Sequence, residues 1–211
     1  MPSVWRTPST CCALTWTGSQ RPPTLTGLRA RICSLVPYKN KKHAKGKNVE
    51  PSKDGDCCKG QTGHHLIPGS LISTKDDQGM PRTDGLGCDS YEHGSAPTVC
   101  VESATKASGS HKRIHDKFDN LLSIQVEKSE NANAAGFFTK SPVIENGAMG
   151  MDTAIHTAAE SHKRAFPLSG CSKKCIESQL KDYYNKHCRK AKLRIQDQNG
   201  NKFTKDSGEN R

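Results

Sequence analysis

Residues 62–68 read TGHHLIP, and the predicted order of strands and helices starts from this stretch. Gly63 lets the chain bend, a histidine doublet follows, and the run ends at a proline that cannot continue a strand ladder. The pattern predicts a short strand that stops at Pro68. Because adjacent strand residues point to opposite faces, His64 and His65 serve one site only where the chain bends, which the flanking Gly63 and Pro68 permit.

Downstream of the doublet, the sequence predicts a loop, a second strand and a helix. The residues after Pro68 are polar and Gly-rich, which is typical of a loop. Residues 96–102, APTVCVE, are rich in β-branched side chains and predict a strand. Ser110, after Gly109, is placed to cap a helix. Four apolar residues of that helix repeat at helical spacing: Ile114, Phe118, Leu121 and Leu122.

Two more histidines, His111 and His115, lie on this predicted helix. A spacing of four residues places them one turn apart on the same face, where both imidazoles can reach one divalent ion. Taken alone, such a pair is more often two exposed histidines than a metal site. With the doublet, the sequence supplies four imidazoles in two groups.

The composition predicts a thin hydrophobic core. Leu, Ile, Val and Phe total 33 of 211 residues, below the roughly 20% under which a chain can fail to fold. Something besides apolar burial must therefore stabilise the ordered part. No apolar run approaches the roughly 20 residues of a transmembrane helix, which excludes an integral membrane protein. The net charge of +11 is uneven, because residues 1–49 contain nine Lys or Arg and no acid.

The ten cysteines show no Cys-x-x-Cys spacing, which argues against thioredoxin-like chemistry and against a zinc ribbon. Cys171 and Cys175 are four residues apart. We interpret them as reduced structural thiols, with metal ligation as the alternative. The sequence leaves open whether any cysteine forms a disulfide.

The chain divides into three regions. Residues 1–50 lack helical or strand periodicity and are expected to form a disordered basic leader or linker. Residues 51–195 are expected to form the domain, with the strand and helix core over about residues 60–125 and a helical extension over about residues 151–192. Residues 196–211 are expected to form a polar tail.

The predicted extension contains two helices. Residues 151–166 carry an apolar stripe that Pro167 ends, and residues 172–192 form an amphipathic, cationic helix. A Gly- and Asn-containing linker, residues 131–150, separates them from the core. We interpret three histidines of the extension as structural: His156, His162 and His187.

The order of these segments resembles a known group of nucleases. A histidine doublet at a strand end, a second strand, and a helix with His-x-x-x-His are similar to the ββα-metal core of the HNH/endonuclease VII superfamily. More narrowly, residues 62–68, 96–102 and 109–116 (GSHKRIHD) resemble bacterial polymorphic toxins with a GHH signature, as in type VI secretion. Residues 161–175 resemble the C-terminal part of such domains. The resemblance covers about residues 57–190 and implies an α+β fold, a small ββα-metal nuclease core with additional C-terminal helices, here after the disordered N-terminal segment.

The resemblance implies a role for each histidine of the two groups. His65 is the expected general base, which takes a proton from water near neutral pH. His64, His111 and His115 are the expected ligands of one divalent metal cation, whether Mg²⁺, Mn²⁺, Zn²⁺ or Ni²⁺, which acts mainly as a Lewis acid at the scissile phosphate. A metal shared by strand and helix would also cross-link the fold. Asp116 is a further candidate for the metal shell.

The sequence lacks the asparagine that is the middle residue of the HNH motif. No asparagine occurs between Asn48 and Asn120, so the residue that braces the base histidine is missing or replaced. His93, just before the second strand, is one candidate, and a plain loop histidine is the alternative interpretation.

Basic side chains near the expected site are candidates for contacts with the nucleic-acid backbone. Such contacts fix position without reading the base sequence, so we expect a largely non-specific, salt-sensitive enzyme. For the cationic helix, a solvated face is an equal alternative. The candidates are Lys112, Arg113, Lys173 and Lys174.

The expected function is a metal-dependent DNA endonuclease that hydrolyses phosphodiester bonds as an antibacterial toxin. The first alternative is a non-enzymatic, zinc-stapled module that binds nucleic acid or another partner; it needs a closed four-ligand site, whereas the nuclease needs an open coordination position. An RNase with the same site is the second alternative. A zinc deaminase is excluded, because the sequence lacks Pro-Cys-x-x-Cys.

The resemblance also implies partners and a location. Members of such families follow a delivery module and are neutralised by an immunity protein. The expected partners are therefore DNA, a cognate immunity protein and a secretion delivery module, although residues 1–50 are too short and irregular to be a recognisable one. We expect secretion by a bacterial delivery system and action in the cytoplasm of the target cell.

Overall fold

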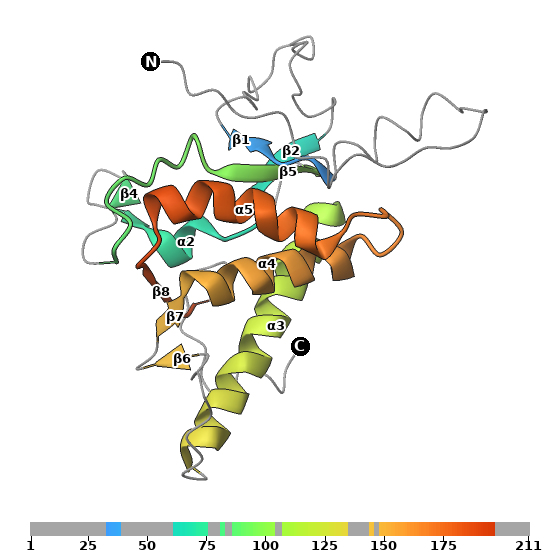
Figure 1. The fold of residues 1–211 in the computed structure, drawn as a ribbon. Helices are drawn as coiled ribbons and strands as arrows, with labels where there is room; N and C mark the ends of the chain where they lie inside the picture. Colours follow the sequence, from blue (N-terminus) through green and yellow to red (C-terminus); the bar gives the residue numbers. More distant parts are fainter. Residues whose placement is uncertain are drawn as a thin grey trace, which may run out of the picture.

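The computed structural model describes most of the chain between residues 61 and 196 and one short upstream stretch. The described stretches are residues 33–38, 61–75, 81–82, 86–103, 107–134, 144–145 and 148–196. Within them the chain is α+β, as the sequence predicts, with small sheets packed against helices (Figure 1). None of the described helices is long and apolar enough to cross a bilayer.

A three-stranded antiparallel sheet carries the histidine doublet. Across the sheet the strands are β1 (Val36–Pro37), β5 (Pro97–Glu102) and β2 (Gln61–His65). In the register of β2 and β5, His64 lies opposite Val99 and His65 opposite Thr98. Both predicted strands are confirmed. The first ends at His65 rather than at Pro68, because the next residues turn into a short helix, α2 (Gly69–Ile72).

The predicted helix after the second strand is confirmed as α3 (Gly109–Ala134), and its apolar stripe faces the core. Two details differ from the expectation. Ser110 is not the cap, because α3 already begins at Gly109; its Oγ instead accepts a hydrogen bond from the backbone N–H of Glu102 at 2.7 Å. The helix also runs four residues into the predicted linker of residues 131–150, over residues 131–134 (NANA), where two alanines favour the helix.

Two further helices complete the helical layer. They are α4 (Met151–Ala165) and α5 (Lys173–His187), close to the predicted bounds. α3 packs against α4, α4 packs against α5, and α5 runs alongside β5 while α3 extends away from the sheet (Figure 1). The core between these layers contains Leu66, Ile67, Val99, Val101, Ile114, Phe118, Leu122, Ile155, Ile176, Leu180 and Tyr184.

Two small sheets lie in stretches that were expected to be loop, linker or helix end. β3 (Thr74–Lys75) pairs with β4 (Pro81–Arg82), and β7 (Ala148–Gly150) lies between β6 (Ile144–Glu145) and β8 (Lys192–Arg194). Each strand has only two or three residues, too few for a hydrophobic period to be visible in the sequence. The pairing of β7 with β8 ties the end of the domain to the start of α4. Of the predicted tail, all but residue 196 lies outside the described residues.

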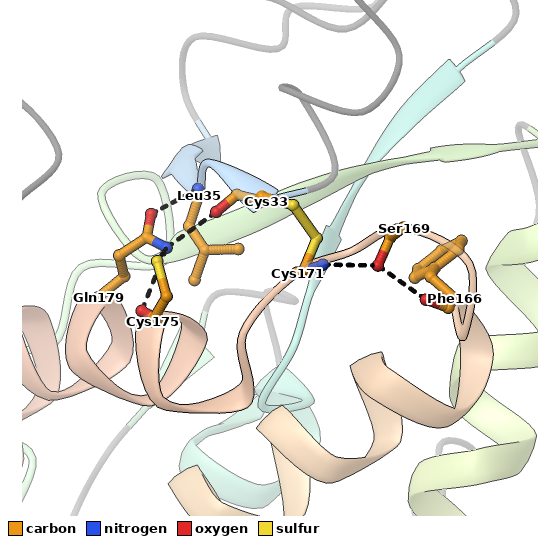
Figure 2. Close-up of a disulfide and its surroundings, with 7 residues drawn as sticks. All are labelled: Cys33, Leu35, Phe166, Ser169, Cys171, Cys175 and Gln179. Carbon is orange, nitrogen blue, oxygen red and sulfur yellow. Dashed lines mark hydrogen bonds between the residues drawn. A yellow bond between two sulfur atoms is a disulfide. The ribbon is translucent and has the colours of Figure 1, made fainter. Parts of the chain in front are cut away.

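Residues 33–38 correct the expectation of disorder over residues 1–50. They include β1, which pairs with β5, and they are cross-linked to the helical extension by the Cys33–Cys171 disulfide (Figure 2). We call residues 33–38 the β1 segment. The β1 segment is held by strand pairing and by a disulfide to residues far away in the sequence. Such contacts cannot be predicted from the periodicity of a short stretch. The rest of residues 1–50 lies outside the described residues.

Disulfides also correct the expectation of reduced thiols. Cys171 is bonded to Cys33, Cys88 is bonded to Cys188, and Cys175 is disulfide-bonded as well. The two bonds join residues 138 and 100 positions apart. Closing a loop of about 100 residues lowers the entropy of the unfolded chain by an amount worth roughly 4–5 kcal/mol in the chain-entropy treatment. The cross-links therefore supply stability that the apolar-poor composition does not.

Candidate metal centre and active site

Three histidines from two elements converge at the junction of β2 and α3. His64 comes from β2, and His111 and His115 come from the first turns of α3. One ring nitrogen of each lies within 4.8 Å of the other two. The ring of His64 is 5.1 Å from that of His111 and 4.4 Å from that of His115, measured between centroids. His64 and His115 are buried, whereas His111 is half-buried.

The start of α3 lies in close contact with the end of β5, which brings the helix histidines to β2. Ser103 and Gly109 both have positive φ angles, of 91° and 61°. A Cβ on Gly109 would lie 2.8 Å from the carbonyl oxygen of Glu102, closer than real Cβ atoms come to other atoms. Only glycine therefore fits this close approach without strain.

The hydroxyl of Thr62 sets the tautomer of His111. Thr62 Oγ1 donates to the carbonyl oxygen of Ser103 at 2.9 Å and lies 3.2 Å from His111 Nδ1. Since the single hydroxyl proton is already donated, Nδ1 must carry the hydrogen of the second bond and donate it to Thr62. The lone pair of His111 is then on Nε2. Such outer hydrogen bonds orient metal-binding imidazoles in proteins.

The three imidazoles fit a divalent metal ion. Two nitrogens bound to one ion at about 2.1 Å each are at most about 4.2 Å apart, and the nitrogens here lie within 4.8 Å of one another. Small side-chain rotations therefore close the site. Imidazole ligands suit Zn²⁺, Ni²⁺ and similar ions better than Mg²⁺. Asp116 is not part of this group: its carboxylate is exposed and lies 2.5 Å from Lys112 Nζ on the same helix.

We call His64, His111 and His115 the triad. His65 lies beside the triad, but its ring is hydrogen-bonded to a different partner. Its Nε2 is 3.1 Å from the backbone carbonyl oxygen of His93. A carbonyl only accepts hydrogen bonds, so Nε2 carries the proton and the lone pair of neutral His65 is on Nδ1. The group at residue 93 that contacts His65 in this bond is thus its main chain rather than its imidazole. The imidazole itself packs on His65, with 4.3 Å between ring centroids.

Burial keeps His93 neutral. The half-buried position of its ring lowers the pKa of His93 below its usual value through desolvation. The Tyr91 hydroxyl lies 3.5 Å from Nδ1 of the same ring, and burial raises the pKa of Tyr91, so the phenol stays protonated. His93 therefore adds no positive charge beside His65 near neutral pH.

The triad and His65 line one pocket of about 260 Å³. His64 and His65, the last two residues of β2, therefore both line the same pocket while still paired with β5. Tyr38 of the β1 segment and His93 complete this side of the pocket. Sequence reasoning missed Tyr38, because it is 27 positions from His65 in a stretch without periodicity, and no local signal identifies it.

The predicted phosphate-contacting residues differ in their surroundings. Arg113 and Lys174 are exposed, and Lys112 pairs with Asp116. Lys173 Nζ lies 2.8 Å from Glu160 Oε2, and hydrogen bonds from Lys173 and then Arg164 lower the pKa of Glu160 to about 2. Lys173 thus has a structural partner. Lys112 and Arg113 lie between His111 and His115 on α3, in the helix turn that carries these two histidines.

Three further histidines of the described residues do not line the pocket. His162 is buried against Phe166, with 5.2 Å between ring centroids, as expected for a structural histidine. His187 Nδ1 lies 2.8 Å from the carbonyl oxygen of Ser90. His156 is exposed and pairs with Glu177 at 3.0 Å.

Comparison with known proteins gives two matches. Residues 61–184 match the family described as GHH signature containing HNH/Endo VII superfamily nuclease toxin 2. The chain is also similar to the DNase toxin Tse7 of Pseudomonas aeruginosa, with 30% identity over 161 residues that cover 76% of this chain and 36% of the relative. The chain thus spans about a third of the length of that relative. No solved structure gave a significant match.

Proposed function

Because the chain belongs to the GHH-signature family of HNH/Endo VII superfamily nuclease toxins, we propose that it is a metal-dependent DNA endonuclease that acts as an antibacterial toxin. The observation that carries the proposal is that one pocket is lined by two groups of histidines with different surroundings. Three imidazoles converge as a metal site, and a fourth is held by a main-chain carbonyl beside them.

His64, His111 and His115 are the proposed ligands of one divalent cation. The burial of His64 and His115 and the hydrogen bond from His111 to Thr62 hold the ring nitrogens toward one point. When bound, the cation supplies Lewis-acid stabilisation of the charge that builds on the scissile phosphate. Three protein ligands leave coordination positions open, which a catalytic site needs and a structural four-ligand zinc site lacks. The triad therefore favours the nuclease over a zinc-stapled binding module.

His65 is the proposed general base. Its Nε2–H donates to the His93 carbonyl, which leaves the Nδ1 lone pair to accept a proton from the attacking water. The same carbonyl stabilises the imidazolium that forms, because the donated hydrogen bond strengthens as the ring becomes positive. His93 takes the place of the missing HNH asparagine through its main chain in this proposal.

Lys112 and Arg113 are the proposed main contacts to the phosphate backbone. They lie in the helix turn that carries His111, and both are exposed. Lys174 is exposed on α5, whereas Lys173 must exchange its ion pair with Glu160 before it can bind a phosphate. Contacts of this kind carry no base information, so we infer cleavage with little sequence preference and strong salt dependence.

The proposal extends to partners and location. As a toxin, the protein would require an immunity protein in the cell that makes it and a secretion route into the target cell, where DNA in the cytoplasm is the substrate. The name of the Pseudomonas relative, DNase toxin, supports this reading. We further propose residues 51–195 as the extent of the nuclease domain, with the β1 segment added to it from upstream.

The test is cleavage of supercoiled plasmid by the full chain, in parallel with a structured RNA of similar length. We expect nicking and linearisation of the plasmid with Zn²⁺, Ni²⁺, Mn²⁺ or Mg²⁺, loss of cleavage with a chelator, and recovery when metal is restored. A folded, metal-loaded protein that cuts neither nucleic acid would contradict a nuclease. Cleavage of RNA alone would replace the DNase by an RNase with the same site.

A further inference from the structure

Tyr38 lies on the proposed base, although it is outside the family match at residues 61–184. Its ring is 4.6 Å from that of His65 between centroids, with a tilt of 35°, and 5.0 Å from that of His93 in an edge contact. Tyr38 is 38% exposed and lines the same pocket as the triad. A residue from upstream of the family domain thus completes the surroundings of His65.

The main chain around Tyr38 is held by the strand that also holds His65. Val36 lies opposite Thr98 in the β1–β5 pair, and His65 lies opposite the same Thr98 in the β2–β5 pair. The Thr98 hydroxyl donates to the Val36 carbonyl at 2.8 Å, and the Tyr38 N–H donates to the Ala96 carbonyl at 3.2 Å. The position of Tyr38 relative to His65 is therefore set across one central strand.

The other end of the β1 segment is clamped to α5. Cys33 is disulfide-bonded to Cys171, just before α5 begins (Figure 2). Gln179 of α5 accepts a hydrogen bond from the Leu35 N–H at 2.8 Å and donates one to the Cys33 carbonyl at 2.9 Å. A two-residue strand is too short to stay paired by itself. The disulfide and Gln179 therefore hold the β1 segment in place.

We propose that Tyr38 is a positioning residue for His65, and that the Cys33–Cys171 disulfide completes the active site by holding Tyr38 there. The inference rests on the proposed nuclease function. The His93 carbonyl fixes one atom of the His65 ring, and a swing of the ring about that bond is limited by the two rings packed on it, His93 at 4.3 Å and Tyr38 at 4.6 Å between centroids. The flat phenol packed on the face of the imidazole blocks that swing. Tyr38 contacts the face of the His65 ring, whereas the Nδ1 lone pair lies in the plane of that ring.

The first test measures plasmid cleavage by the full chain without thiol reductant. The variants are Tyr38→Ala, Tyr38→Phe, Cys33→Ser with Cys171→Ser, and the combination of Tyr38→Ala with the cysteine pair. We expect Tyr38→Ala to lower kcat about 10-fold with KM unchanged, because misplacement of a reacting group costs rate rather than binding. Tyr38→Phe keeps the flat ring and should restore kcat.

The cysteine pair tests the clamp. We expect the double serine variant to lose about as much kcat as Tyr38→Ala, and the combined variant to lose no more, because both changes act on one interaction. Leu168→Ala is the matched control, since this exposed residue lies in the same loop as Cys171. If the serine pair does not fold, Gln179→Ala loosens the same clamp without removing the covalent bond.

A second readout is independent of cleavage. The Tyr38 ring current shifts the NMR signals of the His65 ring protons, so these signals should move in the same direction in Tyr38→Ala and in the clamp variant. Wild-type kcat in Tyr38→Ala, or additive losses in the combined variant, would overturn the proposal. If the wild type cuts no nucleic acid, the nuclease function fails. The NMR shifts then decide the packing of Tyr38 alone, and unchanged signals in both variants would overturn it.

Discussion

The triad and the β1 segment meet at one pocket but are held there by different means. His64, His111 and His115 are positioned by a strand pair and a close β5–α3 contact within residues 61–115. The β1 segment depends on two paired residues and on a disulfide to a position 138 residues away. The contrast teaches that the three histidines of the proposed metal site are positioned within the ββα core, whereas Tyr38, which packs on His65, is held by a disulfide and Gln179.

The largest expected effect tests the core side of this contrast. His111→Ala removes one of the three proposed metal ligands, so we expect loss of bound metal and a fall in DNA cleavage of about 10³-fold or more. Metal content by elemental analysis and plasmid nicking measure the two effects. His156→Ala is the control, because this exposed histidine lies outside the pocket. Full metal binding by His111→Ala would break the assignment of the triad.

The next effect tests the close contact between Gly109, at the start of α3, and the end of β5. Gly109→Ala adds a Cβ 2.8 Å from the Glu102 carbonyl oxygen at a φ of 61°. We expect a loss of stability of about 1–3 kcal/mol, seen as a fall in Tm of about 5 °C or more. Gly150→Ala is the matched control, since nothing lies within 4 Å of its added Cβ. Equal melting temperatures for the two variants would show that this contact is not close.

A smaller effect sharpens the role of the outer hydrogen bond. Thr62→Val keeps the side-chain shape but removes the acceptor for the His111 Nδ1–H. We expect metal affinity to fall about 10- to 100-fold while the fold is retained. Competition titration with a metal chelator measures the affinity, and Thr153→Val on α4 serves as the control for the same chemical change. Unchanged affinity would place the tautomer control of His111 elsewhere.

Phosphate contacts should change the salt dependence rather than the site. Arg113→Ala should reduce the slope of log binding constant against log salt concentration by about 1, with metal binding unchanged. Lys128→Ala is the control on the same helix, because the two positions are 15 residues, or about 22 Å, apart along α3. A slope that falls equally in both variants would show that no local contact at Arg113 exists.

The smallest effect lies at the ion pair that holds Lys173. The pKa of Glu160 is lowered from 4.5 to about 2, first by the hydrogen bond from Lys173. The stability that this pair contributes is therefore present above about pH 4.5 and is lost as the pH falls toward 2. We expect the unfolding free energies of wild type and Glu160→Gln to converge between those pH values in urea titrations. A constant difference would contradict the pairing.

Local pattern predicted the core of this molecule well. The doublet at residues 64–65, the strand of β-branched residues and the i, i+4 histidines are each visible in a short stretch of sequence, and the structure brings the four histidines to one pocket. The helices α4 and α5 were visible for the same reason, since an apolar stripe repeats along each. The base and ligand roles of these histidines remain proposals.

Long-range pairing was not visible in the sequence. Cys33 and Cys171 carry no signal of their pairing, because disulfide connectivity cannot be deduced from cysteine spacing alone. Tyr38 was missed with them. His93 was a candidate from the sequence, but the hydrogen bond of His65 to its backbone carbonyl was not predicted. Every residue has a carbonyl, and only its position after folding makes this one an acceptor for His65.

The central claim is that one pocket holds a metal-binding triad and a separate general base, His65. Its most direct test is the variant His65→Ala in the full chain. Metal content and plasmid cleavage should be measured on the same sample, beside the wild type. We expect one bound metal ion as in the wild type and cleavage reduced about 10²- to 10⁴-fold, the usual contribution of a general base. Cleavage at the wild-type rate by metal-loaded His65→Ala would contradict the assignment of His65 as the base.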